Sequence, residues 1–238
     1  MMLRCFSIVV LVAVVLPAGA DIDVSILRAA TPEAPVRPAG TSAAASAALE
    51  KPGAAAADST EQWYRRASDL DRPGASRAEL EKAAYWYRAA AQQGHSDAQT
   101  NLAAMYAEGR GVAFDALEAA RLYRRAAEAG NARAQYSLAL MYHLGQGVEK
   151  DFAGAIRWYE RAARQGDANA MNNMAFMYGI GEGVEQSNVE AYAWFALAAS
   201  RGNADAAQNR DVAAQELTPE ERRQARERFT QLEQQLGL

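Results

Sequence analysis

NARAQYSLALMYHLGQGVEKDFAGAIRWYERAARQG, residues 131–166, is one of three tandem copies of a single 36-residue pattern. The other two copies span residues 95–130 and 167–202. The glycine that closes each copy, and the glycine just before the first copy, stand at the same spacing: Gly94, Gly130, Gly166 and Gly202. A fixed period of roughly 20–50 residues predicts stacked supersecondary units rather than one globular core.

Each unit is predicted to be a pair of helices. In the quoted unit, apolar residues at helical spacing predict a first helix over about 132–144 and a second helix over about 151–165. The stretch between Gly74 and Thr218 contains no proline, as expected for short helices joined by tight turns. A lone pair cannot bury its apolar faces, so the pairs must stack. The sequence therefore predicts an all-α solenoid of antiparallel helix pairs.

The turn inside each unit has the pattern Gly-x-Gly-Val. It occurs at residues 109–112, 145–148 and 181–184. The first glycine suits a left-handed helix cap, and the second permits a sharp reversal. Asp115, Asp151 and Ser187 follow as expected N-caps of the second helices. The turns lack the Lys-Ser/Thr pair of a phosphate-binding loop, so a structural role is favoured over a phosphate site.

Both ends of the repeat array depart from the pattern. Residues 60–94 are predicted to form a degenerate N-terminal capping repeat, and residues 203–238 a half-repeat followed by a capping helix. The capping helix is predicted to start at Thr218-Pro219-Glu220-Glu221, a strong N-terminal sequence. It carries an apolar stripe, so we expect it to fold back on the solenoid, although it is also suited to binding a partner.

The N-terminal residues resemble an export sequence. Arg4 precedes an apolar stretch and the small residues Ala18-Gly19-Ala20, which predicts a signal peptide over residues 1–20; the alternative is an uncleaved anchor. The only cysteine, Cys5, would leave with it. Residues 21–59 are rich in Ala, Pro, Ser and Thr and are predicted to be a disordered linker. We expect a periplasmic protein, or a secreted one, with no stable membrane span after cleavage.

The unit pattern Ala-Gln-x-x-Leu-Ala-x-Met-Tyr-x-x-Gly-x-Gly-Val, followed by Asp and Ala-x-x-Trp-Tyr-x-x-Ala-Ala-x-x-Gly, resembles the Sel-one-like repeat family. This family is a branch of the tetratricopeptide-like solenoids, so the resemblance implies a right-handed superhelix with the first helices lining its concave side. It also implies a scaffold that binds proteins, and bacterial relatives act as envelope adaptors, regulators of membrane sensors or parts of polysaccharide assemblies. Residue 171 departs from the pattern, with Met171 in place of glutamine.

The sequence offers no set of residues for catalysis. His95 and His143 are the only histidines, and no metal-ligand cluster accompanies either, so we predict neither a metal site nor a cofactor. Serine acyl-transfer motifs are absent, and no carboxylate pair is singled out for acid–base chemistry. The formal net charge of −4 comes without a basic stripe, which argues against nucleic-acid partners. We therefore expect a protein without enzymatic activity.

Positions of the first helices that break the repeat are not required for stacking, so they are the candidates for binding a protein or peptide in the concave groove. The predicted site consists of Arg133, Tyr136, Leu140, His143, Leu144, Asn169, Asn172, Phe176 and Ile180. Its large apolar members would form a binding patch if they are exposed together. The alternative is that they pack against the neighbouring helix or the C-terminal segment.

A second functional hypothesis is binding of peptidoglycan or another envelope polysaccharide. Trp86, Trp158 and Trp194 share one position of the second helix, and tryptophan rings stack on sugars. This position lies beside the core tyrosine, so partial burial explains the tryptophans more simply.

Overall fold

The computed structural model describes residues 59–237, and these residues form ten α-helices and no strands. The helices are α1 (Thr60–Leu70), α2 (Arg77–Gln92), α3 (Ser96–Glu108), α4 (Ala116–Glu128), α5 (Ala132–Leu144), α6 (Phe152–Ala163), α7 (Ala168–Ile180), α8 (Asn188–Ser200), α9 (Ala204–Gln215) and α10 (Pro219–Leu236). The signal peptide predicted over residues 1–20 and the linker up to residue 58 lie outside the described residues. No helix within residues 59–237 is long and apolar enough to cross a membrane.

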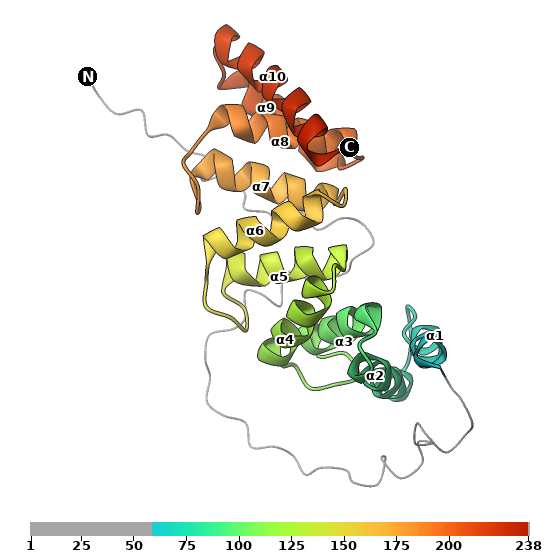
Figure 1. Ribbon diagram of the computed structural model, residues 1–238. Helices are drawn as coiled ribbons and strands as arrows, with labels where there is room; N and C mark the ends of the chain where they lie inside the picture. Colours follow the sequence, from blue (N-terminus) through green and yellow to red (C-terminus); the bar gives the residue numbers. More distant parts are fainter. Residues whose placement is uncertain (1–58, 238) are drawn as a thin grey trace.

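The helices succeed one another along a curved stack, with α1 at one end and α9 and α10 at the other (Figure 1). Each helix from α1 to α8 packs against the next one in the chain, whereas α10 folds back to pack against α8. The pairs α3–α4, α5–α6 and α7–α8 are the three predicted repeats, and α1–α2 precedes them. The predicted solenoid of helix pairs is confirmed. We call α3, α5, α7 and α9 the first helices of their units.

Side-chain caps set where the helices begin. The predicted caps Asp115, Asp151 and Ser187 each accept a hydrogen bond from a backbone N–H in the first turn of α4, α6 and α8. Because Asp151 is the cap, α6 begins at Phe152; it ends at Ala163, before the C-cap Arg164, so it is shorter at both ends than the predicted range 151–165. The first glycines of the turns, Gly109, Gly145 and Gly181, are left-handed C-caps, as expected.

Small residues allow the helices to pack closely, and aromatic rings fill the remaining space. Most buried residues are alanines, and they surround a few large side chains such as Tyr87, Tyr159 and Leu138. Two clusters of buried residues result, one covering α1 to α5 and one covering α5 to α10. In α10, Leu232 is buried in the second cluster and Ala225 is buried as well, so this helix covers the last unit.

The second glycine of each turn lies against the backbone of the preceding unit. A Cβ atom built on Gly147 would lie 2.0 Å from the carbonyl oxygen of Ala116, and one on Gly111 would lie 2.4 Å from the carbonyl carbon of Leu80. By contrast, a Cβ on Gly166 would meet nothing within 4 Å, although Gly166 also has a positive φ of 88°. The turn glycines are therefore required for close approach as well as for backbone conformation.

This difference predicts the effect of two alanine substitutions. Gly166→Ala should cost about 1–2 kcal/mol, the penalty of an L-residue in the left-handed region. Gly147→Ala adds an overlap with backbone that cannot move aside, so we expect a total cost of about 3–5 kcal/mol. Thermal unfolding followed by circular dichroism measures both, at about 2–4 °C for each kcal/mol. Equal shifts for the two variants would contradict the proposed close contact.

Candidate functional site

The first helices lie side by side and are joined by polar side chains. Each hydrogen bond runs from a residue at the start or middle of one first helix to the same region of the preceding one. The pairs are Asn131 Nδ2 to Asp97 Oδ1 (2.6 Å), Arg133 to Asn101, Asn203 Nδ2 to Asn169 Oδ1 (2.9 Å) and Asn209 Nδ2 to Asn172 Oδ1 (3.2 Å). We call the surface formed by α3, α5, α7 and α9 the first-helix face.

A second row of hydrogen bonds connects this face to the buried tyrosines. The amide of Asn101 donates to the hydroxyl of Tyr87 (2.9 Å), and the amide of Asn173 donates to the hydroxyl of Tyr159 (3.0 Å). Burial raises the pKa of Tyr87 to about 12. In the last unit the tyrosine is replaced by Phe195, so Asn209 has no hydroxyl to bind there, and its amide bonds to Asn172 instead.

Tyr136 and Phe176, the two aromatic members of the predicted site, are half-buried. The ring of Tyr136 lies 5.8 Å from the ring of Tyr159, and the ring of Phe176 meets Phe195 edge-on at 5.0 Å. Both pack against the second buried cluster. Burial, followed by the nearby charge of Asp167, raises the pKa of Tyr136 to about 12. Part of each ring therefore packs against neighbouring helices, and only the remainder faces solvent.

Leu140, Leu144 and Ile180, the aliphatic members, are used differently. Leu140 and Leu144 are half-buried, and Ile180 is 41% exposed. Neither buried cluster includes any of the three. These large apolar side chains on the first-helix face therefore contribute little to the two cores.

The polar members of the predicted site are engaged with neighbouring units. Arg133 is exposed but bonds to Asn101, and Asn169 accepts from Asn203. Asn172 is only 6% exposed, so its side chain supports the stack rather than facing solvent.

His143 is also held in place by its surroundings. Its Nε2 lies 3.0 Å from a carboxylate oxygen of Glu182, in the next unit's turn. Its ring meets those of Phe152 and Tyr159 edge-on. The pair joins the end of α5 to the turn after α7, next to Leu144 and Ile180 on those helices.

Sequence reasoning missed one residue of this surface, Val212 on α9. It is 60% exposed and stands 36 residues after Phe176, which stands 36 residues after Leu140. The repeat spacing could have identified it, because Arg210 and Asp211 obscure the pattern only locally. We call Leu140, Leu144, Phe176, Ile180 and Val212 the apolar row.

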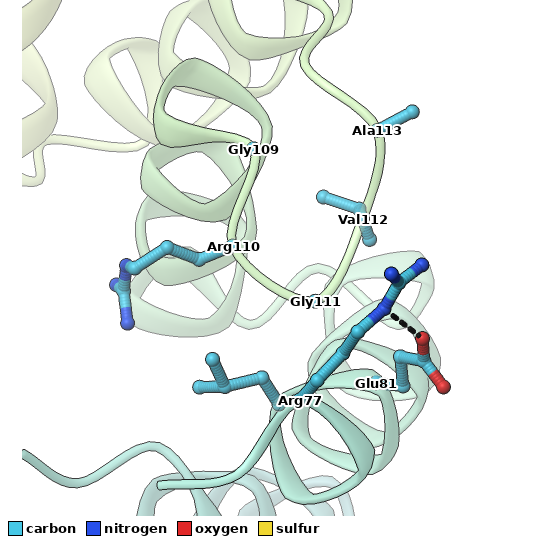
Figure 2. Close-up of a pocket in the computed structure, with 8 residues that line it drawn as sticks. Arg77, Glu81, Gly109, Arg110, Gly111, Val112 and Ala113 are labelled. Carbon is cyan, nitrogen blue, oxygen red and sulfur yellow. Dashed lines mark hydrogen bonds and ion pairs between the residues drawn. The ribbon is translucent and has the colours of Figure 1, made fainter. Parts of the chain in front are cut away.

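A shallow pocket lies away from this face, where the turn after α3 meets the start of α2. Figure 2 shows Gly109, Gly111, Val112 and Ala113 along one side of it, with Arg77 and Arg110 pointing in different directions. The Nε of Arg77 lies 2.9 Å from Glu81, and Arg110 is paired with Asp71 and Glu108. Both guanidinium groups are thus already neutralised, which makes the pocket a poor site for an anion.

The remaining candidates for chemistry have structural roles. His95 caps α3 through Nδ1, stacks on Tyr64 and lies 3.2 Å from Glu61. Within residues 59–237, no group of three or more His, Cys, Asp or Glu side chains is arranged to hold a metal ion.

The three repeated tryptophans are largely occupied by protein contacts. Trp194 is 3% exposed. Trp86 and Trp158 pack against the first cluster, and arginine side chains lie over their rings at 5.1 and 4.4 Å from the ring centres. These contacts leave little ring surface on which a sugar could stack.

Asp167, the N-cap of α7, lies under the edge of the first-helix face. Its carboxylate accepts from the backbone N–H of Ala170 at 2.9 Å. Burial raises its pKa above the ordinary value, and the hydrogen bonds from Ala170 and Asn169 only partly oppose this. The equivalent caps of α5 and α9 are the neutral Asn131 and Asn203.

Comparisons with known proteins agree on one kind of repeat. The sequence model of the family described as Sel1 repeat matches residues 61–71, 74–95, 96–131, 132–167 and 168–203, more than half of the chain. No curated protein matches the chain in sequence.

Among solved structures, the fold is similar to a Sel1 repeat protein from Oxalobacter formigenes, with 31% identity and a TM-score of 0.58, over 62% of this chain and 60% of that one. It is also similar to c5321, a protective antigen of uropathogenic Escherichia coli strains with an SLR fold. In that case identity is 30% and the TM-score 0.51, over 74% of this chain and 46% of that one. The chain therefore spans less than two thirds of either relative.

The burial of Asp167 predicts that Asp167→Asn stabilises the fold in a pH-dependent way, because asparagine keeps the cap and removes the charge. A carboxyl whose folded pKa is raised destabilises the fold above that pKa, and this penalty disappears as the pH falls below 3.8, its ordinary value. The variant should therefore melt at a higher temperature than the wild type at pH 7, with a difference that narrows on acidification. Asp115→Asn, at an exposed cap, is the control and should not raise the melting temperature. A lower melting temperature for Asp167→Asn at pH 7 would refute the assignment.

Proposed function

The chain belongs to the Sel1 repeat family, and from that membership we propose that it is a non-catalytic scaffold of the bacterial envelope that binds a protein or peptide on its first-helix face. Sel1 repeats are generally scaffolds for protein–protein interaction, and proteins built from them are typically not enzymes. The further elements of the proposal are the place in the cell, the binding surface and the regulatory role.

One observation carries the choice of surface. Leu140, Leu144 and Ile180 are large apolar side chains on the first-helix face that belong to neither buried cluster. The preceding unit has Ala104 and Glu108 at the matching positions, so stacking does not require large apolar residues there. Exposed apolar patches of this kind typify interaction sites.

The proposed location rests on residues 1–20, whose sequence resembles an export signal. In the periplasm, a scaffold of this kind would regulate a membrane sensor or take part in an envelope or polysaccharide assembly. Binding of polysaccharide by the chain itself is the weaker alternative, because Trp86, Trp158 and Trp194 are occupied by protein contacts.

Affinity capture with matched variants tests the proposed surface. The full chain, tagged at its C-terminus and expressed in its own host, should recover a partner whose yield falls about tenfold in Ile180→Gln, because one apolar anchor is lost. Ile180 is the last residue of α7 and is 41% exposed, so the variant should fold normally.

Leu117→Gln is the control for this experiment. Leu117 is 70% exposed on α4, outside the first-helix face, and the change removes a similar amount of apolar surface. Capture should be unchanged in this variant. A partner recovered equally with all three proteins would exclude the first-helix face as the binding surface. Sedimentation of the chain with purified peptidoglycan would instead support the polysaccharide alternative.

A further inference from the structure

The register between α7 and α9 brings the C-terminal members of the apolar row together. Asn172 on α7 is hydrogen-bonded to Asn209 on α9, which fixes how the two helices lie against each other. One turn further along, on the same side of each helix, are Phe176 and Val212. Apolar side chains therefore continue from one first helix to the next.

A carboxylate ends this apolar surface. Glu216 follows Val212 by one turn, caps the C-terminus of α9 and is exposed. It makes no ion pair with any residue in the range 59–237. Glu185, in the turn after α7, is exposed and unpaired in the same way.

Three cations on or near the first-helix face are already neutralised or remote. Arg210 forms an ion pair with Asp211 at 2.7 Å, and His143 lies against Glu182 at 3.0 Å. Arg133 lies at the opposite end of α5, bonded to Asn101. Two exposed cations at this end form no ion pair with any described residue: Lys150, beside the cap Gly145, and Arg222, whose Nε donates to the carbonyl of Leu217 at 3.2 Å. The unpaired charges closest in sequence to Val212 and Ile180 are nevertheless the carboxylates Glu216 and Glu185.

Resting on the function proposed above, we propose that the apolar row and Glu216 form one docking site for a peptide segment of a partner protein that carries apolar side chains next to a lysine or arginine. The apolar side chains of the segment bury Leu140, Phe176 and Val212, and the basic residue meets Glu216. An acidic segment would place like charges together at α9, which opposes binding. The site thus selects by charge as well as by apolar surface.

Selection from a displayed library of random short peptides tests this chemistry, with the folded full chain as bait. The enriched peptides should combine apolar residues with lysine or arginine, and each should lose binding to Val212→Gln. Glu216→Gln should lower the affinity of these peptides by up to about fivefold, the effect of one exposed ion pair. Leu117→Gln should leave their affinity unchanged. Circular dichroism of each variant checks that the solenoid is intact.

Three results would overturn the proposal: no enrichment, enrichment of acidic or uncharged peptides, or peptides that bind Val212→Gln as well as the wild type. These outcomes are separable from failure of the proposed function. A host partner whose capture depends on Ile180 but not on Val212 or Glu216 leaves the scaffold function standing and removes this docking site. A host partner whose capture does not depend on Ile180 would exclude the first-helix face as the binding surface.

Discussion

The stack depends on the contact between the second glycine of each turn and the backbone of the preceding unit. Gly111, Gly147 and Gly183 lie against Leu80, Ala116 and Phe152, at distances where a side chain has no room. Since protein interiors do not tolerate such overlap, the contact fixes each unit relative to the one before it. A fixed relation between units is what makes equivalent positions of α3, α5, α7 and α9 fall into rows. Any site built from several first helices therefore depends on glycines that lie outside it.

The sequence was sufficient for those features that local chemistry determines. Helix caps such as Asp151 and left-handed glycines such as Gly145 depend on a few neighbouring residues, so their patterns predict the structure directly. Side chains that act between units were harder to predict. Asn172 was expected on the binding surface, yet it is buried and accepts a hydrogen bond from Asn209, 37 residues later. That bond in turn depends on Phe195, which lacks the hydroxyl that tyrosine supplies in the other units.

The same dependence on partners explains why the candidate site was only partly predictable. The positions that break the repeat were visible in the sequence, but their use was not. Tyr136 and Phe176 interrupt the pattern because their rings fill space beside Tyr159 and Phe195. Met171 departs from the pattern for a similar reason. Gln99 and Gln135 donate to backbone carbonyls of the preceding helix, whereas Met171 fills the equivalent place as a fully buried apolar side chain.

The two halves of the first-helix face can accordingly contribute different things to recognition. Near the starts of the first helices its polar groups are paired with each other, as in Asn131 with Asp97 and Asn203 with Asn169, so a ligand there would have to replace existing hydrogen bonds for little net gain. Toward the C-terminal ends of α7 and α9 the exposed side chains Ile180 and Val212 have no such partners, and covering them is favourable by about 25 cal/mol for each Å² of apolar surface. Affinity is then expected from the apolar half, whereas charges such as Glu216 mainly affect orientation and the choice between partners. Because the rest of the fold does not use these side chains, binding specificity can change there without disturbing the contacts between units.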